Sequence, residues 1–527
     1  MALKALLAAL AVVVMIVPVA HASAGAGRVN SSSFGLPGAP RFDAYALPDS
    51  SLNADNAGEP TIGIPWNTNS LFFQAFTATH RAVFSNETDA NGAPKVTWTD
   101  VTPAFSRINV DPMLYADHVT NRVFQGGLDG PCSVMGLSDD DGKTWLPSHN
   151  MCNGAQLDHQ SIGSGPWPKE DVLSRSTVYP RATYYCSQLG TDACATSPNG
   201  GMDWLPPAQV TGSCGSLHGH IKVSEADGFA ILPNGNCGGK VGFGFTNNGG
   251  ITWDSRTMPD SKSGDGFDPS AAFSTGGWLY LAQANIDGLH VALSKDDGAS
   301  WQTIGNLTAD ATPGTWLDLS GVFKDPKTGN PIKYGSFPDV VAGDNTRVAI
   351  SFLGTTNPDG KHPFDDCSKA SDENIWHYYL AESFDAGSTW SITRLSEDPV
   401  QIGAIWNGGG GDACRNLLDF ADMQMDSYGR LAIGFADGCL DSCAKKYHEW
   451  VAGTGSPPVG SDSRHAWGTV LRQTTGLSLF AMYDKPVPVV VGTPPPMTTE
   501  PQATPGIEAP LAMLAVAALA VAVRRRA

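Results

Sequence analysis

The sequence predicts an all-β protein, a single β-propeller of seven four-stranded antiparallel blades. Two observations support this prediction: an eight-residue turn motif that ends in Trp recurs along the chain, and seven similar strand openings follow one another between residues 59 and 423. The composition agrees, because 59 of the 527 residues are Gly and only 16% are charged. Such a composition is typical of folds built from many short strands and turns.

The clearest copy of the turn motif reads Ser-x-Asp-x-Gly-x-Ser-Trp at residues 294–301. A hydroxyl and a carboxylate two residues apart can bond the backbone N–H groups of a tight turn, and Gly takes the positive φ. The Trp then buries an apolar face worth roughly 2–3 kcal/mol when it is fully covered. We therefore interpret the motif as a structural hairpin turn rather than a ligand site. Its other copies lie at 138–145, 197–204, 246–253 and 383–390, with a looser version at 85–98.

Each expected blade opens with an acidic residue, His or Pro ahead of a short apolar strand. Four-stranded antiparallel units repeated in this way are typical of propeller blades, which leave few exposed sheet edges. The last blade lacks the turn motif, so we expect its outer strands at 467–473 and 477–483, with residues 42–47 completing the ring. Six blades are the alternative count. The openings lie at 59–64, 111–114, 158–162, 218–223, 268–271, 337–341 and 420–423.

The first residues of the chain have the features of a secretory signal peptide. An apolar run follows Lys4 and ends at the small-x-small site Ala20–Ala22. At the other end, a Pro- and Thr-rich spacer precedes a short apolar segment and three Arg residues. The expected organisation is a signal peptide at 1–22, an extension at 23–54, the propeller at 55–485, the spacer at 486–506 and an anchor segment at 507–527.

The C-terminal segment resembles the archaeal surface-sorting tail, in which Pro-Gly-Phe, a short hydrophobic stretch and an Arg cluster follow one another. Here Ile507 stands in place of the Phe. The resemblance implies that the tail is removed and the body attached to lipid at the cell surface. The alternative is a plain C-terminal membrane anchor with its positive charge inside. Both alternatives predict an extracellular protein anchored at the cell surface, associated with the membrane through its tail.

Net charge and cysteine content limit the partners and the cysteine chemistry that the chain can have. The net charge of −19 argues against nucleic acid as a partner, because nucleic-acid binders carry a basic footprint. Ten cysteines in an exported protein favour disulfides over metal binding. Sequence alone leaves their connectivity open. The favoured pairs are Cys132 with Cys152, Cys186 with Cys194, Cys214 with Cys237, Cys367 with Cys414, and Cys439 with Cys443.

The repeated turns match the Asp-box (BNR) motif, so residues 55–485 resemble the sialidase-like superfamily of propellers. The resemblance implies the fold, and it makes glycan-directed chemistry an expectation. It does not supply catalytic residues, because the Phe/Tyr-Arg-Ile-Pro motif of sialidases is absent. Residues 179–181 read Tyr-Pro-Arg, which shares residue types with the motif but not their order. Function has to be argued from the site and not from the fold.

Propeller geometry predicts which face would carry a site. The repeated turns lie on one face, and the blade-to-blade connections and the loops between second and third strands lie on the other. Those loops vary in length and contain all ten cysteines, and variable loops on a rigid scaffold often bind ligands. We therefore expect the functional site on the face opposite the repeated turns, where disulfides hold the long loops.

The blade openings bring carboxylates and histidines towards the axis on that face. Carboxylates arranged in this way could form a glycosidase pair or hold Ca²⁺, or they could simply bond the ends of neighbouring inner strands. Ca²⁺ is thus an optional ligand and no cofactor is required. The candidate catalytic residues are Asp111, Asp158, Asp268 and Asp419, and the candidate substrate-binding residues are His159, His220, Arg107 and Arg415.

Three functions are compatible with these residues. The first is an exported, surface-tethered, exo-acting glycoside hydrolase of the sialidase-like type. The second is a non-catalytic propeller that binds carbohydrate or protein in adhesion. The third, a metal-dependent hydrolase or lyase, needs His159, His218 and His220 to face one point. The sequence leaves the substrate, the metal and the oligomeric state open.

Overall fold

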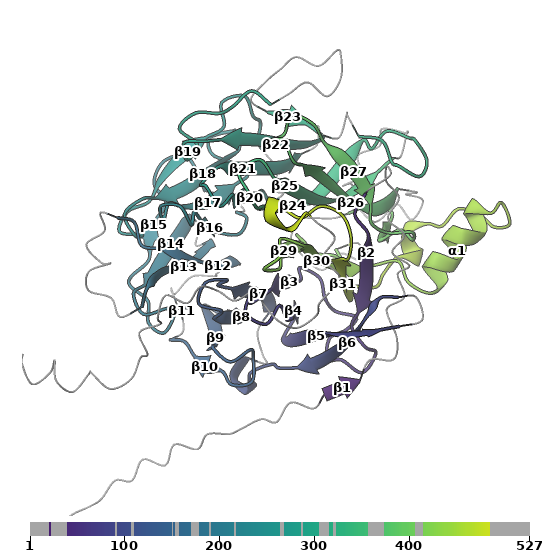
Figure 1. Ribbon diagram of the computed structural model, residues 1–527, viewed down its shortest axis with the longest axis horizontal. Helices are drawn as coiled ribbons and strands as arrows, with labels where there is room; N and C mark the ends of the chain where they lie inside the picture. Colours follow the sequence, from purple (N-terminus) through teal and green to yellow (C-terminus); the bar gives the residue numbers. More distant parts are fainter. Residues whose placement is uncertain are drawn as a thin grey trace, which may run out of the picture. The chain divides into compact units, whose positions relative to one another are not determined.

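The computed structural model contains a β-propeller of seven blades around a central axis (Figure 1), as the sequence predicts. Residues 1–492 form one compact unit and residues 493–527 a second. No helix among the described residues is long and apolar enough to cross a bilayer. The structure describes residues 20–22 and 39–484, apart from 90–91, 107–109, 150, 153–157, 170–178, 189–190, 216–217, 264–267, 286–287, 305–315, 320–322, 357–373 and 406–414.

The first four blades follow the chain, each with its first strand nearest the axis (Figure 1). Blade 1 comprises β3 (Thr61–Gly63), β4 (Leu71–Ala75), β5 (Ala78–Thr88) and β6 (Pro94–Asp100), with β1 (Ala20–Ala22) paired to β6. Blade 2 comprises β7 (Val110–Ala116), β8 (Val123–Asp129), β9 (Cys132–Ser138) and β10 (Leu146–Pro147), with β11 (Met151–Cys152) paired to β9. Blade 3 comprises β12 (Asp158–Pro166), β13 (Arg181–Gln188), β14 (Asp192–Ser197) and β15 (Ala208–Gln209). Blade 4 comprises β16 (Lys222–Val223), β17 (Ala230–Asn234), β18 (Gly242–Thr246) and β19 (Asp254–Thr257).

The remaining blades continue the ring. Blade 5 comprises β20 (Ser270–Phe273), β21 (Leu279–Asn285), β22 (Gly288–Ser294) and β23 (Leu317–Asp318). Blade 6 comprises β24 (Tyr334–Ala342), β25 (Val348–Thr355), β26 (Ile375–Ser383) and β27 (Ser391–Arg394), with β28 (Gln401–Ile402) paired to β26. Blade 7 comprises β29 (Asp422–Met425), β30 (Leu431–Asp437), β31 (Trp467–Gln473) and β2 (Phe42–Ala46). The described residues also form the short helices η1 (Ala104–Ser106), α1 (Ser442–Val451), η3 (Gly460–Asp462) and η4 (Ala481–Tyr483).

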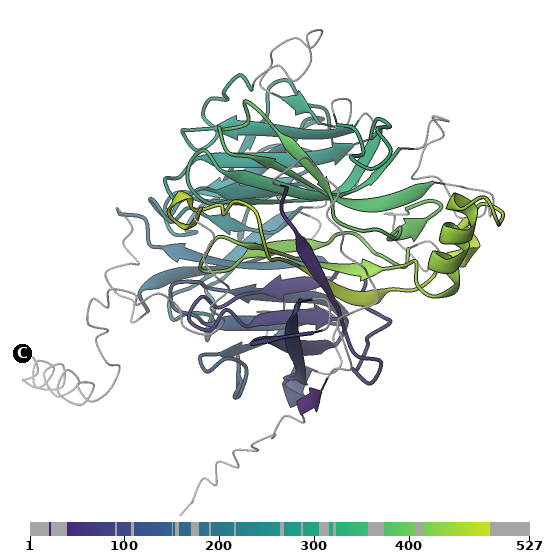
Figure 2. The same ribbon diagram turned by 45° about the vertical axis from the view of Figure 1, so that its right-hand side comes forward.

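The ring closes by pairing its two ends. β2 pairs antiparallel with β31, from Phe42 opposite Gln473 to Ala46 opposite Thr469, so the expectation that residues 42–47 complete the ring is confirmed. The strand predicted at 477–483 is wrong. The edge of β31 is already occupied by β2, and the side-chain amide of Gln473 donates to the carbonyls of Thr475 and Leu477 and holds the chain in a turn. The chain then ends its described part in η4, coloured yellow in Figures 1 and 2.

The repeated turn is structural, as its residues predict. In blade 5 the Ser294 hydroxyl accepts from Gly298 N at 2.8 Å, and Asp296 accepts from Ser300 N at 2.8 Å and Ser300 Oγ at 2.6 Å. Gly298 has a φ of +78°, and a Cβ there would lie 2.4 Å from the ring of Phe243 in blade 4. The turn therefore fastens its own hairpin and packs against the preceding blade.

Removing the carboxylate from this turn is expected to destabilise the protein. Asp296→Ala should lower the free energy of unfolding by about 1–2 kcal/mol, because two backbone and hydroxyl donors lose their acceptor. Asp296→Asn is the matched control and should be nearly neutral, since Asn199 and Asn248 accept the same backbone bond in blades 3 and 4 and donate from Nδ2 to the side chain at the position from which Asp296 accepts. Denaturant unfolding of both variants checks this, and equal losses in both would contradict it.

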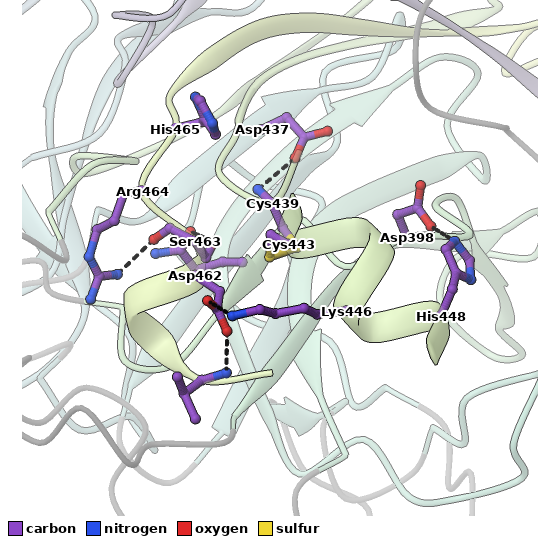
Figure 3. Close-up of a disulfide and its surroundings, with 12 residues drawn as sticks. Asp398, Asp437, Cys439, Cys443, Lys446, His448, Asp462, Ser463, Arg464 and His465 are labelled. Atoms are coloured by element: carbon purple, nitrogen blue, oxygen red, sulfur yellow. Dashed lines mark hydrogen bonds and ion pairs between the residues drawn. A yellow bond between two sulfur atoms is a disulfide. The ribbon is translucent and has the colours of Figure 1, made fainter. Parts of the chain in front are cut away.

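The disulfides lie in or beside loops on the face opposite the repeated turns, and Cys186 and Cys194 are paired residues of β13 and β14 next to such a loop. The structure confirms the pairs Cys186–Cys194, Cys214–Cys237 and Cys439–Cys443. Cys132 is disulfide-bonded, and its backbone pairs directly with that of Cys152. The last of the three bridges joins the start of α1 to the end of β30 (Figure 3). Cys367 and Cys414 lie outside the described residues.

Candidate functional site

Four of the seven blade openings share an unusual backbone conformation. Glu59, Asp111 and His159 have φ values of +53°, +51° and +51°, and Phe337 at the opening of blade 6 has +51°. The pairing register of the innermost strand shifts beside three of these positions, which marks a β-bulge. A positive φ is rare for residues with a side chain, and such residues concentrate at functional sites. Glu59, Asp111 and His159 line a common pocket at one end of the axis.

This pocket, which we call the axial pocket, has a volume of about 20 Å³. That space admits little more than one water molecule or the end of a larger group. Its wall carries far more titratable side chains than a packed propeller core requires. The lining residues are Glu59, Asp111, Pro112, Asp158, His159, Gln160, His218, His220, Asp268 and Phe420.

Glu59 and Asp419 form a carboxyl pair beside the axial pocket. Burial and the neighbouring Asp419 hold the pKa of Glu59 well above its usual range, and a hydrogen bond joins the two side chains. Burial also raises the pKa of Asp419, which the bond from Glu59 opposes. Arg415 Nη2 lies 2.6 Å from Asp419 Oδ2 and 3.9 Å from Glu59 Oε1. Glu59 is therefore the protonated member of the pair, and Asp419 is the ionised one.

His159 is the second charged centre of the pocket. Its Nδ1 lies 3.2 Å from Asp268 Oδ2, and both side chains are nearly buried. Burial lowers the pKa of His159, but Asp268, Asp158 and Glu59 outweigh it and raise the pKa to about 10. His159 is thus a cation at neutral pH. In contrast, burial lowers the pKa of His220 to about 4, so this imidazole is neutral.

Several buried polar atoms around the pocket have no hydrogen-bond partner among the described residues. They are Asp268 Oδ1, Asp419 Oδ1, His218 Nε2 and both amide atoms of Gln160. Buried polar groups are normally paired, because an unpaired one costs roughly 1–3 kcal/mol. Acceptors and donors left open in one place suit a ligand that offers both hydroxyl donors and oxygen acceptors.

Deeper in the axis, carboxylates and hydroxyls serve the fold. Asp422 Oδ2 accepts from Ile62 N at 2.8 Å, and Ser161 Oγ accepts from Ile221 N at 2.8 Å. Asp339 accepts from Met423 N in the same way. Each bond joins the innermost strand of one blade to that of the next. For this deeper layer, the structural alternative, in which polar side chains bond neighbouring inner strands, is therefore correct.

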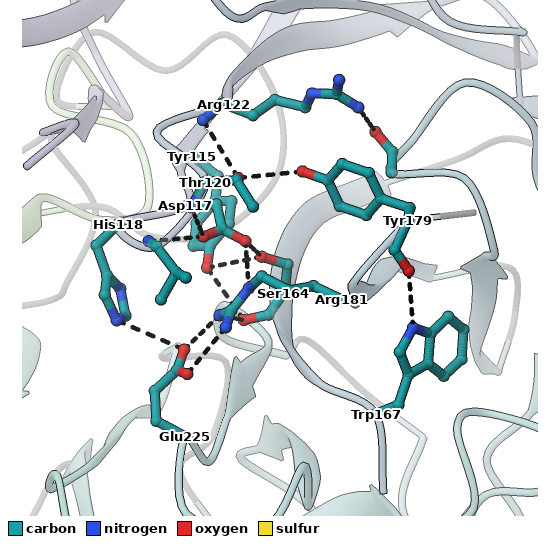
Figure 4. A network of polar contacts seen from close by, with 12 residues as sticks. Tyr115, Asp117, His118, Thr120, Arg122, Ser164, Trp167, Tyr179, Arg181 and Glu225 are labelled. Atoms are coloured by element: carbon teal, nitrogen blue, oxygen red, sulfur yellow. Dashed lines mark hydrogen bonds and ion pairs between the residues drawn. The ribbon is translucent and has the colours of Figure 1, made fainter. Parts of the chain in front are cut away.

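A channel of about 160 Å³ continues from the axial pocket along the axis. Gln160 and His220 line both spaces, so they join the pocket to the channel. Lys222 contributes an ammonium group to the channel wall, and His118 and Glu225 line it as well. His118 and Glu225 belong to a network with Asp117, Ser164 and Arg181 (Figure 4), in which Arg181 Nε donates to Asp117 at 2.7 Å.

Most of the site residues expected from the sequence meet in one place. Asp111, Asp158, His159, His220 and Asp268 line the axial pocket, and Asp419 and Arg415 lie beside it with Glu59. Arg107 lies outside the described residues. Within the described part of the chain, no group of three or more His, Cys, Asp or Glu residues is arranged to hold a metal ion.

Sequence reasoning missed the pairing of Glu59 with Asp419 and the roles of Gln160 and Phe420. The ring of Phe420 packs edge-on against that of His220, with centroids 4.7 Å apart. Gln160 follows the left-handed residue His159, as Pro60 and Pro112 follow Glu59 and Asp111. The equivalent position of Gln160, Pro60 and Pro112 in the repeat could have identified Gln160 as a site residue from the sequence.

Comparison with known proteins finds only remote structural likenesses. No protein-family model matches the chain, and no curated protein sequence matches it. Among solved structures, the BP39L lectin from Burkholderia pseudomallei is 12% identical with a TM-score of 0.42, over 73% of this chain and 93% of the lectin. The Hadza microbial sialidase Hz136 is 12% identical with a TM-score of 0.37, over 78% and 74%. YCF48 from Cyanidioschyzon merolae is 11% identical with a TM-score of 0.37, over 82% and 98%. At these values the likenesses carry no conclusion about family or function.

Proposed function

We propose that this protein is an exported, glycan-binding propeller that recognises a neutral, hydroxyl-rich sugar at the axial pocket. The observation that carries the proposal is the set of buried, unpartnered acceptors and donors on Asp268, Asp419, Gln160 and His218. Sugar hydroxyls can donate to the carboxylates and accept from the amide and imidazole. Because the axial pocket is small, it takes one edge of the sugar while the ring stays at the mouth.

The charge of the site favours a neutral sugar over a sialic acid. With Glu59 protonated and the pKa of Asp111 raised by burial, three carboxylates (Asp158, Asp268 and Asp419) still face only two cations, His159 and Arg415. The excess of negative charge would repel the carboxylate of a sialoside. In a water-poor site this repulsion costs several kcal/mol.

Glycoside hydrolysis is the second candidate, and the Glu59–Asp419 pair favours it. A carboxylic acid held neutral beside an ionised carboxylate can donate a proton to a leaving-group oxygen. The base or nucleophile has to be a carboxylate other than Asp419, because the two groups of a glycosidase lie at least about 5 Å apart and Glu59 and Asp419 share a hydrogen bond. Asp111, whose pKa burial also raises, could take part in the same proton transfers. In this candidate function Glu59 is the acid and Asp419 its ionised partner.

Two further features belong to the same proposal. The signal-peptide pattern and the C-terminal tail support export and attachment to the cell surface.

The carboxylate oxygens of the axial pocket are the ligand type that Ca²⁺ prefers, so we include an optional Ca²⁺ in the proposal. Sugar binding with and without added Ca²⁺ or chelator would show whether the ion takes part.

A glycan array with the mature protein tests the proposal. Neutral glycans should bind and sialosides should not, and Asp268→Asn should weaken binding at least tenfold, because a charge-assisted hydrogen bond contributes about 1.5–3 kcal/mol. Asp254→Asn, an exposed Asp on β19, is the matched control and should bind normally. Unchanged binding by a folded Asp268→Asn protein would reject the site.

The hydrolase candidate needs a separate assay. Release of sugar from a panel of neutral aryl glycosides, abolished in Glu59→Gln, would support it. Array binding without any release across the panel would leave the protein as a binding propeller. Binding to neither glycans nor glycosides would overturn both candidate functions.

A further inference from the structure

Arginine side chains fasten neighbouring blades on the face that carries the repeated turns. Arg81 in blade 1 donates to the carbonyl of Asp141 at 2.6 Å, Arg122 in blade 2 to that of Gly200 at 2.7 Å, and Arg256 in blade 4 to that of Asp297 at 2.5 Å. Asp141, Gly200 and Asp297 each occupy the fourth position of a repeated turn in the next blade. The Arg122 guanidinium, lying against the ring of Tyr179, shows the arrangement (Figure 4).

An Arg side chain also makes hydrogen bonds across the boundary between blades 6 and 7. Arg347 comes directly before β25, as Arg122 comes directly before β8. It donates to the carbonyl of Ser478 at 2.6 Å and to both carboxylate oxygens of Asp484. In both of these blades, the Arg directly before the second strand bonds an acceptor that lies later in the chain, in the next blade or just after it.

At the boundary between blades 7 and 1, the described residues show no such bond. Arg430 precedes β30 just as Arg122 and Arg347 precede their strands, but blade 1 has only the looser turn at 85–98. Arg430 Nε forms an ion pair with Asp426 Oδ2 of its own turn at 3.3 Å, and the guanidinium lies over the Tyr428 ring. This ion pair lacks hydrogen-bond geometry, so the buried Nε makes no hydrogen bond among the described residues.

A pocket of about 250 Å³ opens where that bond is missing. Arg430, Arg472 and Arg41 line it, together with hydroxyl and amide groups of Ser85, Asn86, Thr88 and Thr474. Arg472 lies over the Phe84 ring, and its Nη2 is 3.9 Å from Asp426 Oδ2, beyond hydrogen-bond distance. Arg41 is held by Asp43 at 3.0 Å. We call this space the seam pocket.

The seam pocket has an excess of positive charge in a strongly acidic protein. Three guanidinium groups and one carboxylate, that of Asp43, line the pocket, and Asp426 pairs with Arg430, while the whole chain carries a net charge of −19. Guanidinium groups bind carboxylate, sulfate and phosphate through paired N–H donors. The volume is below the roughly 300–1,000 Å³ of pockets for drug-sized ligands. It therefore suits a group of monosaccharide size.

We propose that the seam pocket is a second binding site, separate from the axial pocket, for a small oxyanion carried by a sugar-sized molecule. The oxyanion takes the place of the turn carbonyl that Arg430 would otherwise bond. Arg472 and Arg41 supply further donors, and the hydroxyl groups of the wall contact the ring that carries the charge. The site joins the first and last blades, so an occupied pocket also stabilises the closure of the ring.

Calorimetric titration of the mature protein tests this site. Glucuronate, galactose 6-sulfate and glucose 6-phosphate are the probes for a charged sugar, inorganic sulfate is the probe for a free anion, and glucose is the neutral control. Charged probes should bind and raise the melting temperature, and glucose should do neither at this site. Binding of inorganic sulfate as tight as that of any sugar supports the oxyanion site and assigns it to the free ion.

A pair of variants separates binding from structure. Arg430→Gln should weaken the binding of charged probes at least tenfold and change the melting temperature little, since Arg430 bonds no neighbouring blade. Arg122→Gln, the equivalent residue between blades 2 and 3, should lower the melting temperature and leave affinity unchanged. The proposal is overturned if no charged probe binds at millimolar concentration, if Arg430→Gln binds as the wild type does, or if both variants lose stability equally.

Discussion

A mature chain that begins at residue 48, without β2, is expected to lose the folded ring. β2 supplies the outer strand of blade 7, and its loss removes the side chains of Phe42 and Tyr45 from the core, where at most 1% of each is exposed. Losing a large buried aromatic side chain costs about 3–5 kcal/mol, and two such losses approach the 5–15 kcal/mol that stabilise a typical domain. The deletion also leaves the edge of β31 unpaired, which invites aggregation.

Circular dichroism and size-exclusion chromatography of the shortened chain check this expectation. A synthetic peptide of residues 39–50 should restore folding by adding the missing strand, as in β-strand complementation. The same peptide with Phe42→Asp is the matched control and should not restore it. A shortened chain that is monomeric and melts like the full one would contradict the role of β2 as the closing strand.

Glu382→Gln is expected to stabilise the protein strongly at alkaline pH. Glu382 lies on β26 immediately before the repeated turn of blade 6 and is 3% exposed. Burial raises the pKa of this carboxyl from 4.5 to about 8. In the folded protein Glu382 therefore holds its proton up to about pH 8, whereas in the unfolded chain it loses the proton near pH 4.5.

The sign of the pH dependence follows from these two values. Between about pH 4.5 and 8 the folded state binds more protons than the unfolded state, so stability falls as pH rises and levels off above the folded pKa. The resulting loss in the free energy of unfolding reaches a few kcal/mol, because one pKa unit corresponds to about 1.4 kcal/mol.

Denaturant unfolding at pH 5 and pH 9 measures the effect. Glu382→Gln should match the wild type at pH 5 and exceed it by a few kcal/mol at pH 9. Glu449→Gln on the solvent-exposed side of α1 is the surface control and should change neither value. An equal effect of Glu382→Gln at both pH values would contradict the role assigned to burial.

The repeated turn allowed the fold to be predicted, because every part of it acts locally. Its hydroxyl, carboxylate and Gly bond within eight residues, so the same letters produce the same hairpin wherever they occur. The predicted disulfides within single loops, such as Cys186–Cys194 and Cys439–Cys443, were correct for the same reason. When two cysteines are only a few residues apart, few other cysteines can reach either of them.

The prediction failed where distant segments compete for one position. Residues 477–483 have the apolar pattern of a strand, but β2, more than 400 residues away in the sequence, occupies the edge they would need. The site shows the same limit. The blade openings could be listed from the sequence, whereas the proton shared by Glu59 and Asp419 depends on burial and on a contact between the first and last blades.

The sequence by itself determined the seven-bladed architecture, the face on which the disulfide-held loops lie, and most of the residues around the axial pocket. Those features depend on local turn chemistry and on a period that repeats along the chain. Only the tertiary structure decided which carboxylates bond inner strands and which surround the pocket, and where an Arg of the last blade finds no acceptor in the first. These outcomes depend on distances between side chains that meet only when the ring closes, and no local pattern records them.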